Sequence, residues 1–273
     1  MDEAALRAQL AALGASLFAR GYSVGTAGNI SVRLPDGFLM TPTNSCLGRL
    51  DPARISKLAS DFSYVSGDKP SKEVFMHRAV LTARPDAGAV VHLHSTHATA
   101  IACLAEPGEV APIPPLTPYF VMRVGRLLPV IRYYRPGDGA MESDIHEAAK
   151  SAKAVLLANH GPVVSGRTLE DAVHAAEELE EAARLAEMNQ AALAILRLGH
   201  VPMIGVNMAL PIIAAAEGDV FDEVMMPVSL ALAERCDAVL RLGGPSQGAD
   251  QEVARFTQAG KPVFRTLAEI PPG

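Results

Sequence analysis

The sequence predicts an α/β protein with more than one folding unit. Short apolar runs rich in β-branched residues, such as 89–94 and 154–158, alternate with segments in which apolar residues recur at helical spacing. The 273 residues correspond to about 1.8 domains at roughly 150 residues each. Hydrophobic residues make up 49% of the chain and charged residues 20%, which supplies a buried core and excludes disorder as the main state.

Charge and cysteine content exclude several classes of protein. The 24 basic and 30 acidic residues give a net charge of −6, whereas a nucleic-acid binder needs a basic face. Three widely spaced cysteines without a CxxC pair argue against a disulfide framework and favour a reducing cytoplasm. The acidic N-terminus is unlike a signal peptide, and no apolar run approaches the roughly 18 residues that span a bilayer. We therefore expect a soluble cytoplasmic protein that binds neither nucleic acid nor membrane.

The first part of the chain shows an ordered series of helix and strand patterns. Ser71 is expected to cap a helix because its hydroxyl can accept a hydrogen bond from a free backbone N–H. The expected elements are a helix at 4–19, a turn and strand within 25–34, strands at 38–41 and 62–65, a helix at 71–82, a strand at 89–94, a helix at 97–104, a loop at 111–118, and strands at 130–134 and 154–158.

The second half begins with a long helix, after which shorter helices and strands are expected to alternate. A helix is expected over 168–198, with Thr168 at its N-cap and Asp171 in its first turn. Its four acids are expected to form a solvated face: Glu177, Glu178, Glu180 and Glu181. Beyond Gly199 the pattern predicts a strand, a loop, a helix at 228–235, a strand at 238–242, a glycine-rich loop, a helix at 249–259 and a strand at 262–266.

The strongest chemical pattern is His92-Leu93-His94. Residues i and i+2 of a strand point to the same side, so both imidazoles leave one face of the sheet. Two such imidazoles can bind one divalent metal at about 2.0–2.1 Å from each nitrogen. His160 directly follows the apolar run 154–158 and is a third candidate ligand, because sites in α/β proteins are built at strand ends. A structural role for each histidine remains the alternative.

Residues that suit an anion precede this pattern. Ser71 and Lys72 lie at an expected helix N-terminus, where free N–H groups and a partial positive charge favour phosphate. Glu73 is either an acid favoured by the helix dipole or a carboxylate that transfers protons or binds metal near the histidines. The loops 25–29 and 41–44 offer backbone, hydroxyl and amide groups for phosphate, although a glycine-rich loop alone is weak evidence.

Five motifs in this order resemble the class II aldolase/adducin family. They are Thr26-Ala27-Gly28-Asn29-Ile30-Ser31, Thr41-Pro42-Thr43, Ser71-Lys72-Glu73, His92-Leu93-His94-Ser95 and Asn159-His160-Gly161. The resemblance covers residues 1–187 and implies a three-layer αβα domain with a central mixed sheet. It also implies a homo-oligomer, typically a tetramer, whose active site lies at a subunit interface.

The resemblance assigns roles to individual residues. It implies that His92, His94 and His160 hold zinc or another divalent metal, and that Glu73 is the acid/base and can also ligate the metal. It implies a substrate phosphate held by Gly28, Asn29, Thr43, Ser71 and Lys72, with lysine where some members have serine. Tyr119 is expected to act in catalysis, reaching the site from a neighbouring subunit. No role is carried over to His77, His97, His146, His174 or His200.

Longer segments resemble the 3-oxo-tetronate 4-phosphate decarboxylase branch of this family. They lie at 40–50, 117–125 and 133–138. The implied reaction converts the phosphorylated keto-sugar acid to dihydroxyacetone phosphate and CO2 through a metal-chelated enediolate, with the metal as Lewis acid and a protonated Glu73 as proton donor to C2. A retro-aldol cleavage of a ketose 1-phosphate gives the same enediolate, so a sugar-phosphate aldolase remains an alternative. A non-enzymatic, adducin-like binding module is the other.

Residues 188–273 resemble the nucleoside 2-deoxyribosyltransferase-like fold, a small Rossmann-like α/β module. Its S-x-G-x-x-x-E segment appears at 246–252 and would make Glu252 a nucleophile, with Ser246 at an anion-binding turn. The strand and glycine loop that open this fold are missing from the sequence. We therefore expect an accessory module, with a second active site at Ser246 and Glu252 as the alternative.

Overall fold

The computed structural model describes residues 2–111, 113, 115, 117–216, 218, 220–243 and 246–273. The chain divides into two units, residues 1–186 and 187–273. Across the described ranges, no helix is both long and apolar enough to cross a membrane.

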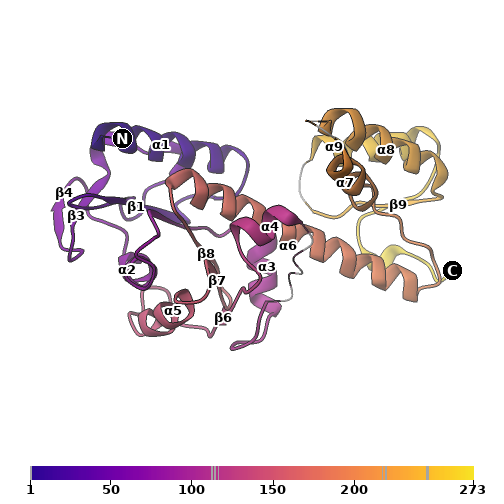
Figure 1. Cartoon of the computed structure of the whole chain (residues 1–273). Helices are drawn as coiled ribbons and strands as arrows, with labels where there is room; N and C mark the ends of the chain where they lie inside the picture. The colour runs from indigo at the N-terminus through magenta and orange to yellow at the C-terminus, as the bar shows by residue number, and fades with distance from the viewer. Residues whose placement is uncertain are drawn as a thin grey trace. The chain divides into compact units, whose positions relative to one another are not determined.

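The first unit is built on a mixed sheet that has eight strands within the described residues (Figure 1). These strands are β1 (Asn29–Leu34), β2 (Gly37–Met40), β3 (Ser56–Ala59), β4 (Tyr64–Ser66), β5 (Ala89–His92), β6 (Val130–Ile131), β7 (Ala154–Leu157) and β8 (Gly161–Gly166). Their order across the sheet is β4-β3-β2-β1-β5-β8-β7-β6. Neighbouring strands run antiparallel, except that β6 and β7 run parallel. The expected central mixed sheet is confirmed.

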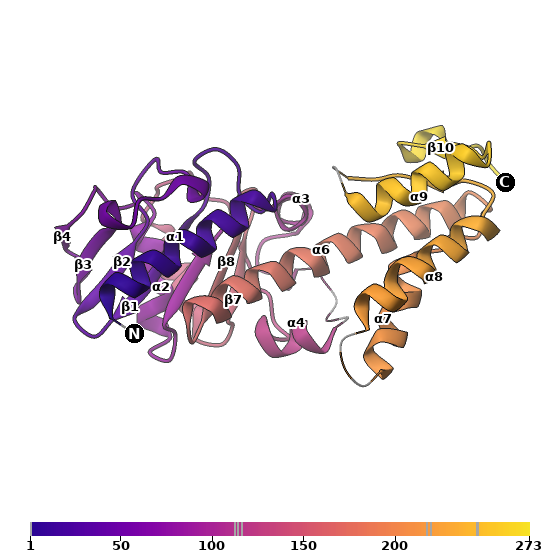
Figure 2. The ribbon, with the colours of Figure 1, turned by 90° about the horizontal axis from the view of Figure 1, so that it is seen from above.

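Helices cover both faces of this sheet (Figures 1 and 2). One face carries α1 (Glu3–Ala19), α3 (Thr96–Leu104), α4 (Pro118–Arg123) and the first part of α6 (Leu169–Arg197), and the other carries α2 (Val74–Ala83) and α5 (Met141–Ala149). Successive strand residues alternate between the two cores, so Val91 packs on the α1 side and Val90 on the α2 side. The central strand β5, which ends at His92, is therefore buried from both sides.

Several elements differ from the sequence-based expectation. The helix expected from Ser71 begins instead at Val74, because the Ser71 hydroxyl accepts the Glu73 N–H and holds 71–73 in a turn. Strand β8 was not expected, since glycine at both ends and Pro162 inside it are typical of a turn. Helix α5 and strand β3 were also missed. The proline-rich loop at 111–118 includes Pro112, Pro114 and Leu116, which lie outside the described residues.

Glu180 on α6 is buried and does not belong to a solvated face. Its two carboxylate oxygens accept the backbone N–H groups of His97 and Ala98 at 2.7 and 2.8 Å. These groups lie in the first turn of α3, where N–H groups have no partner within the helix. The expectation for the four acids is therefore wrong for Glu180, which caps the helix that follows His94.

We expect Glu180→Ala to lower the free energy of unfolding by about 1–3 kcal/mol, because it leaves buried donors without an acceptor. Urea unfolding followed by circular dichroism measures this change. Glu181→Ala is the matched control on the same helix, because Glu181 is exposed and its ion pair with Arg184 is worth at most about 1 kcal/mol. Equal unfolding midpoints for the two variants would contradict the capping role.

The second unit combines helices with a small parallel sheet. It contains α7 (Gly205–Ala215), α8 (Phe221–Arg235), β9 (Val239–Leu240), α9 (Gln247–Gln258) and β10 (Val263–Phe264). Strands β9 and β10 pair in parallel on either side of α9 in the sequence. The strand expected directly after Gly199 is wrong, because residues 200–204 form no regular element and α7 follows them. Gly244 and Pro245, in the expected glycine-rich loop, lie outside the described residues.

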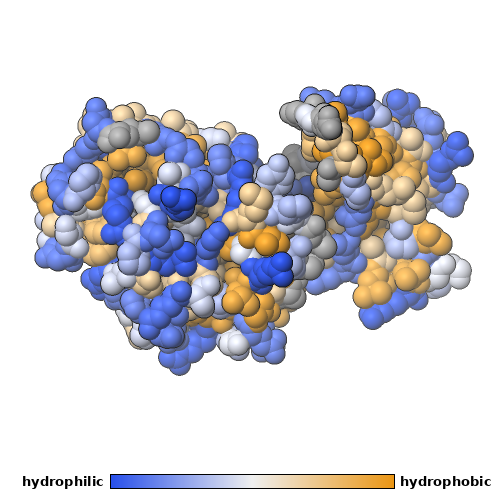
Figure 3. Space-filling view, viewed as in Figure 1, coloured by the Kyte–Doolittle hydropathy of each residue, from blue (hydrophilic) through white to orange (hydrophobic). Residues whose placement is uncertain are grey.

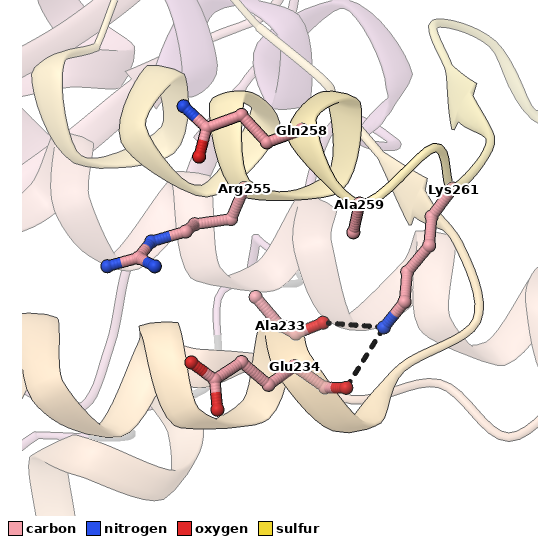
Figure 4. Close-up of a pocket in the computed structure, with 6 residues that line it drawn as sticks. All are labelled: Ala233, Glu234, Arg255, Gln258, Ala259 and Lys261. Carbon is pink, nitrogen blue, oxygen red and sulfur yellow. Dashed lines mark hydrogen bonds between the residues drawn. The ribbon is translucent and has the colours of Figure 1, made fainter.

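A shallow cavity of about 270 Å³ lies between the ends of α8 and α9 (Figure 4). Lys261 lines it and donates to the carbonyl oxygens of Glu234 and Cys236 at 2.9 and 2.7 Å. These carbonyls end α8, so the lysine charge satisfies acceptors that the helix leaves unpaired. Neither Ser246 nor Glu252 lines this cavity.

Candidate metal centre

Two imidazoles meet where β5 ends. The rings of His92 and His94 have centroids 5.0 Å apart, and their Nε2 atoms are separated by 3.1 Å. His92 Nδ1 donates to the carbonyl oxygen of Pro162 at 2.8 Å, which leaves Nε2 as the lone-pair nitrogen. Such a bond on the far nitrogen is the usual way in which a metal-binding histidine is oriented.

His160 joins them from the turn between β7 and β8. Its ring centroid lies 4.8 Å from those of both His92 and His94. The turn requires positive φ angles at Asn159 (55°) and Gly161 (152°). A Cβ atom on Gly161 would lie 2.5 Å from the carbonyl oxygen of Leu93, so only glycine brings the turn this close to β5.

Burial keeps these three histidines in the form that binds metals. Desolvation is the largest cause that lowers the pKa of His92, His94 and His160, most strongly for fully buried His92. A neutral imidazole has a free lone pair, as metal coordination requires. One nitrogen from each histidine lies within 4.8 Å of the other two, and this donor set suits Zn²⁺ or a similar divalent ion.

Glu73 faces the same cluster. Its Oε2 lies 3.7 Å from His92 Nε2, and its Oε1 lies 3.5 Å from His160 Nε2. The carboxylate comes from the turn before α2, and its side chain is only 16% exposed. The structure thus brings together all four side chains that the resemblance assigned to the metal.

Asn29 lies beside Glu73. Its side chain is buried, and Nδ2 donates to Glu73 Oε2 at 2.7 Å while Oδ1 contacts His77 Nε2. Sequence reasoning assigned Asn29 to phosphate and set His77 aside. The pattern that could have revealed His77 is its spacing, since it lies on α2 about one helical turn after Glu73, the residue that precedes this helix.

The remaining phosphate candidates do not share one cavity. Thr43 lines a cavity of about 250 Å³ together with Thr26, Asn44 and Arg49. Gly28, with φ of 78°, packs its backbone against β5, where a Cβ atom would lie 2.9 Å from His92 O. Ser71 is buried, whereas Lys72 is exposed. The structure therefore brings Thr43 to this cavity, while Gly28, Asn29, Ser71 and Lys72 do not line it.

Two further predictions concern residues on α4 and at the start of α9. Tyr119 lies on α4 with 59% of its surface exposed, and its ring lies under the guanidinium of Arg123. Among the described residues of one chain, Tyr119 has no hydrogen bond, ion pair or ring contact with the histidine cluster. Glu252 is on α9, and Ser246 precedes that helix, so both belong to the second unit.

Comparisons with known proteins agree with this geometry. Residues 8–186 match the family model described as "Class II Aldolase and Adducin N-terminal domain". The chain is 52% identical over 184 residues to the 3-oxo-tetronate 4-phosphate decarboxylase of Escherichia coli K12, covering 67% of this chain and 86% of that protein. It is 38% identical to the 5-methylthioribulose-1-phosphate/5-deoxyribulose-1-phosphate aldolase of Rhodospirillum rubrum, covering 60% of this chain and 72% of that protein.

A solved structure shows the same similarity. The crystal structure of YgbL from Escherichia coli aligns with a TM-score of 0.65 at 48% identity, covering 74% of this chain and 93% of that one. The family match ends at residue 186, where the first unit ends.

Proposed function

The chain belongs to the class II aldolase and adducin family, and from this membership we propose that it is a metal-dependent carbon–carbon lyase that decarboxylates 3-oxo-tetronate 4-phosphate. The products would be dihydroxyacetone phosphate and CO2. The observation that carries the proposal is the three-histidine cluster faced by Glu73, in a chain that is 52% identical over 184 residues to a decarboxylase of that name.

The donor set indicates what the site contributes. A divalent metal held by His92, His94 and His160 would supply a Lewis acid that withdraws the electrons left by the departing carboxylate. Glu73 lies beside the cluster and would deliver a proton to C2 from its carboxyl group, which completes the ketone product. Thr43 and Arg49 line a cavity in the same unit, and their hydroxyl and guanidinium groups suit the phosphate.

Decarboxylation can be tested directly on the purified protein. We expect 3-oxo-tetronate 4-phosphate to yield CO2 and dihydroxyacetone phosphate in equal amounts. A chelator should abolish the reaction and zinc should restore it, because the charge developed at C2 needs an electron-withdrawing partner. Metal-independent turnover, or a purified protein that takes up no divalent ion, would contradict the proposal.

The second candidate is a sugar-phosphate aldolase. It is favoured by the similarity to the Rhodospirillum rubrum aldolase, and cleavage of a ketose 1-phosphate leaves the same type of electron pair beside a carbonyl group. Aldehyde release from ketose 1-phosphates, without CO2 release from the keto acid, would support this function over decarboxylation.

We also propose that copies of the chain assemble, with Tyr119 reaching the site of a neighbour. The exposure of Tyr119 and of Met122 and Leu127 beside it supports this, and hydrophobic surface is visible around α4 (Figure 3). Light scattering of the purified protein tests the assembly, and a monomer that decarboxylates would contradict it.

We propose that the second unit has a nucleoside 2-deoxyribosyltransferase-like fold. We also propose that its role is accessory to that of the first unit. The parallel β9 and β10 around α9 support this, since they form one βαβ unit. Release of base from a nucleoside, lost in Glu252→Ala, would instead favour a second active site.

A further inference from the structure

A buried chain of polar side chains leads from the central sheet to Glu73. Ser31 Oγ on β1 lies 2.7 Å from His77 Nδ1, His77 Nε2 contacts Asn29 Oδ1, and Asn29 Nδ2 lies 2.7 Å from Glu73 Oε2. The exposed fractions of Ser31, Asn29 and His77 are 1%, 5% and 0%. Each of these groups is therefore shielded from water and depends on its neighbours in the chain for hydrogen bonds.

Only one arrangement of hydrogens satisfies this chain. Asn29 Nδ2 donates to Glu73 Oε2 at 2.7 Å, and a carboxylate oxygen that carries no hydrogen can only accept, so the NH2 group of Asn29 faces Glu73. Asn29 Oδ1 then faces His77, which must donate from Nε2. A neutral imidazole with hydrogen on Nε2 has a lone pair on Nδ1, and this accepts the hydroxyl hydrogen of Ser31.

The burial of His77 keeps this tautomer neutral. Desolvation lowers its pKa to about 3, so the imidazole carries a single hydrogen in the neutral pH range. If the amide of Asn29 were reversed, its carbonyl oxygen would face Oε2 of Glu73, and two acceptors with no hydrogen between them repel.

We propose that His77 is a positioning residue that acts through Asn29 to hold the carboxylate of Glu73 by its Oε2 atom. The other oxygen, Oε1, is then left facing His160 at 3.5 Å, where substrate chemistry would occur. The proposal rests on the proposed function for the role of Glu73, and it reassigns Asn29 from phosphate binding to the support of that acid/base. It also explains why a histidine without a place in the metal cluster is fully buried beside it.

Two substitutions of similar size separate the two bonds of His77. In His77→Gln the amide nitrogen lies where Nε2 was, so the donor to Asn29 is kept. In His77→Asn the shorter amide reaches only toward Ser31, and the donor to Asn29 is lost. We expect kcat to fall about 100-fold in His77→Asn, since a displacement of about 1 Å at a reacting group costs that much. His77→Gln should retain kcat within a few fold.

Further measurements distinguish positioning from general destabilisation. KM and metal content should stay within about twofold of wild type in both variants, because His77 is fully buried and both of its ring nitrogens face protein side chains, Ser31 and Asn29. His146→Asn is the control. His146 also contacts α2, through the carbonyl oxygen of Ala79, but it does not belong to the series of hydrogen bonds from Ser31 to Glu73. Equal kcat values for His77→Asn and wild type would overturn the proposal.

If His77→Asn does not fold, Asn29→Asp tests the same series of hydrogen bonds, because it places an oxygen against Glu73. Unchanged kcat in Asn29→Asp would also overturn the proposal.

Nitrogen-15 NMR of the histidine-labelled protein without metal gives a readout independent of activity. We expect His77 as a neutral imidazole with hydrogen on Nε2 between pH 6 and 8. Hydrogen on Nδ1 would overturn the positioning role even in an active enzyme. If instead the wild-type protein shows this tautomer but decarboxylates nothing, the proposed function fails while the hydrogen-bonded chain stands.

Discussion

Replacing His92 with alanine is expected to abolish metal binding and decarboxylation together. His92 is fully buried, and its Nε2 lies 3.1 Å from His94 Nε2 and 3.7 Å from Glu73 Oε2. Loss of groups that merely orient a ligand costs about 10- to 100-fold in metal affinity or activity, so loss of the ligand itself should exceed about 100-fold. Equilibrium dialysis with zinc, followed by elemental analysis, measures the affinity.

His174→Ala is the matched control, because His174 is exposed on α6 and does not belong to the cluster. It should leave zinc binding and turnover unchanged. Full zinc content in His92→Ala would mean that the metal binds elsewhere. His92→Ala should keep the helical circular dichroism spectrum of the wild-type protein. This measurement separates loss of the metal site from loss of the fold.

Glu73→Gln is expected to keep the metal and lose proton transfer. The three histidines proposed as ligands remain, while an amide cannot deliver a proton to the product carbon. General acid–base catalysis contributes about 10²–10⁴-fold, and kcat should fall by this factor. Glutamine has nearly the same shape, and its carbonyl oxygen can still accept the hydrogen bond from Asn29 Nδ2.

Zinc titration of the same variant decides between the two roles of this residue. Unchanged zinc affinity with a large loss of kcat supports the acid/base role. If zinc affinity falls as far as in His92→Ala, Glu73 acts mainly as a ligand. Wild-type kcat in Glu73→Gln would contradict both.

The sequence predicted the parts of the fold that depend on short-range patterns. The helix at 3–19 and the strand at 89–92 agree with the expected 4–19 and 89–94, because helical and strand periodicities are properties of neighbouring residues. Strand β8 was missed because Gly161 and Pro162 are typical of a turn, and only pairing with β5 and β7 makes this segment a central strand. In the second unit, residues 200–204 and α7 were misassigned, since apolar residues interrupted by Pro211 do not distinguish helix from strand.

The sequence by itself determined the chemistry available to this protein. It showed two histidines on one side of a strand, a third after another strand, and a carboxylate before a helix. Strand β5 ends at His92, two residues before the expected end, but the Leu93 N–H still donates to the Pro162 carbonyl oxygen, and His92 and His94 lie together as their i, i+2 spacing predicts. The family resemblance then indicated that these separate motifs form one site.

The tertiary structure alone decided how these groups are held. The positive φ angles at 159 and 161 bring His160 to within 4.8 Å of the other rings. The buried carboxylate of Glu180 caps α3 from a helix 82 residues away, and Asn29 faces Glu73 across 44 residues. Such contacts join residues far apart in the chain, and they are selected because buried polar groups must find partners inside the protein. A pattern of neighbouring residues in the sequence does not show which distant partner a buried polar group will find.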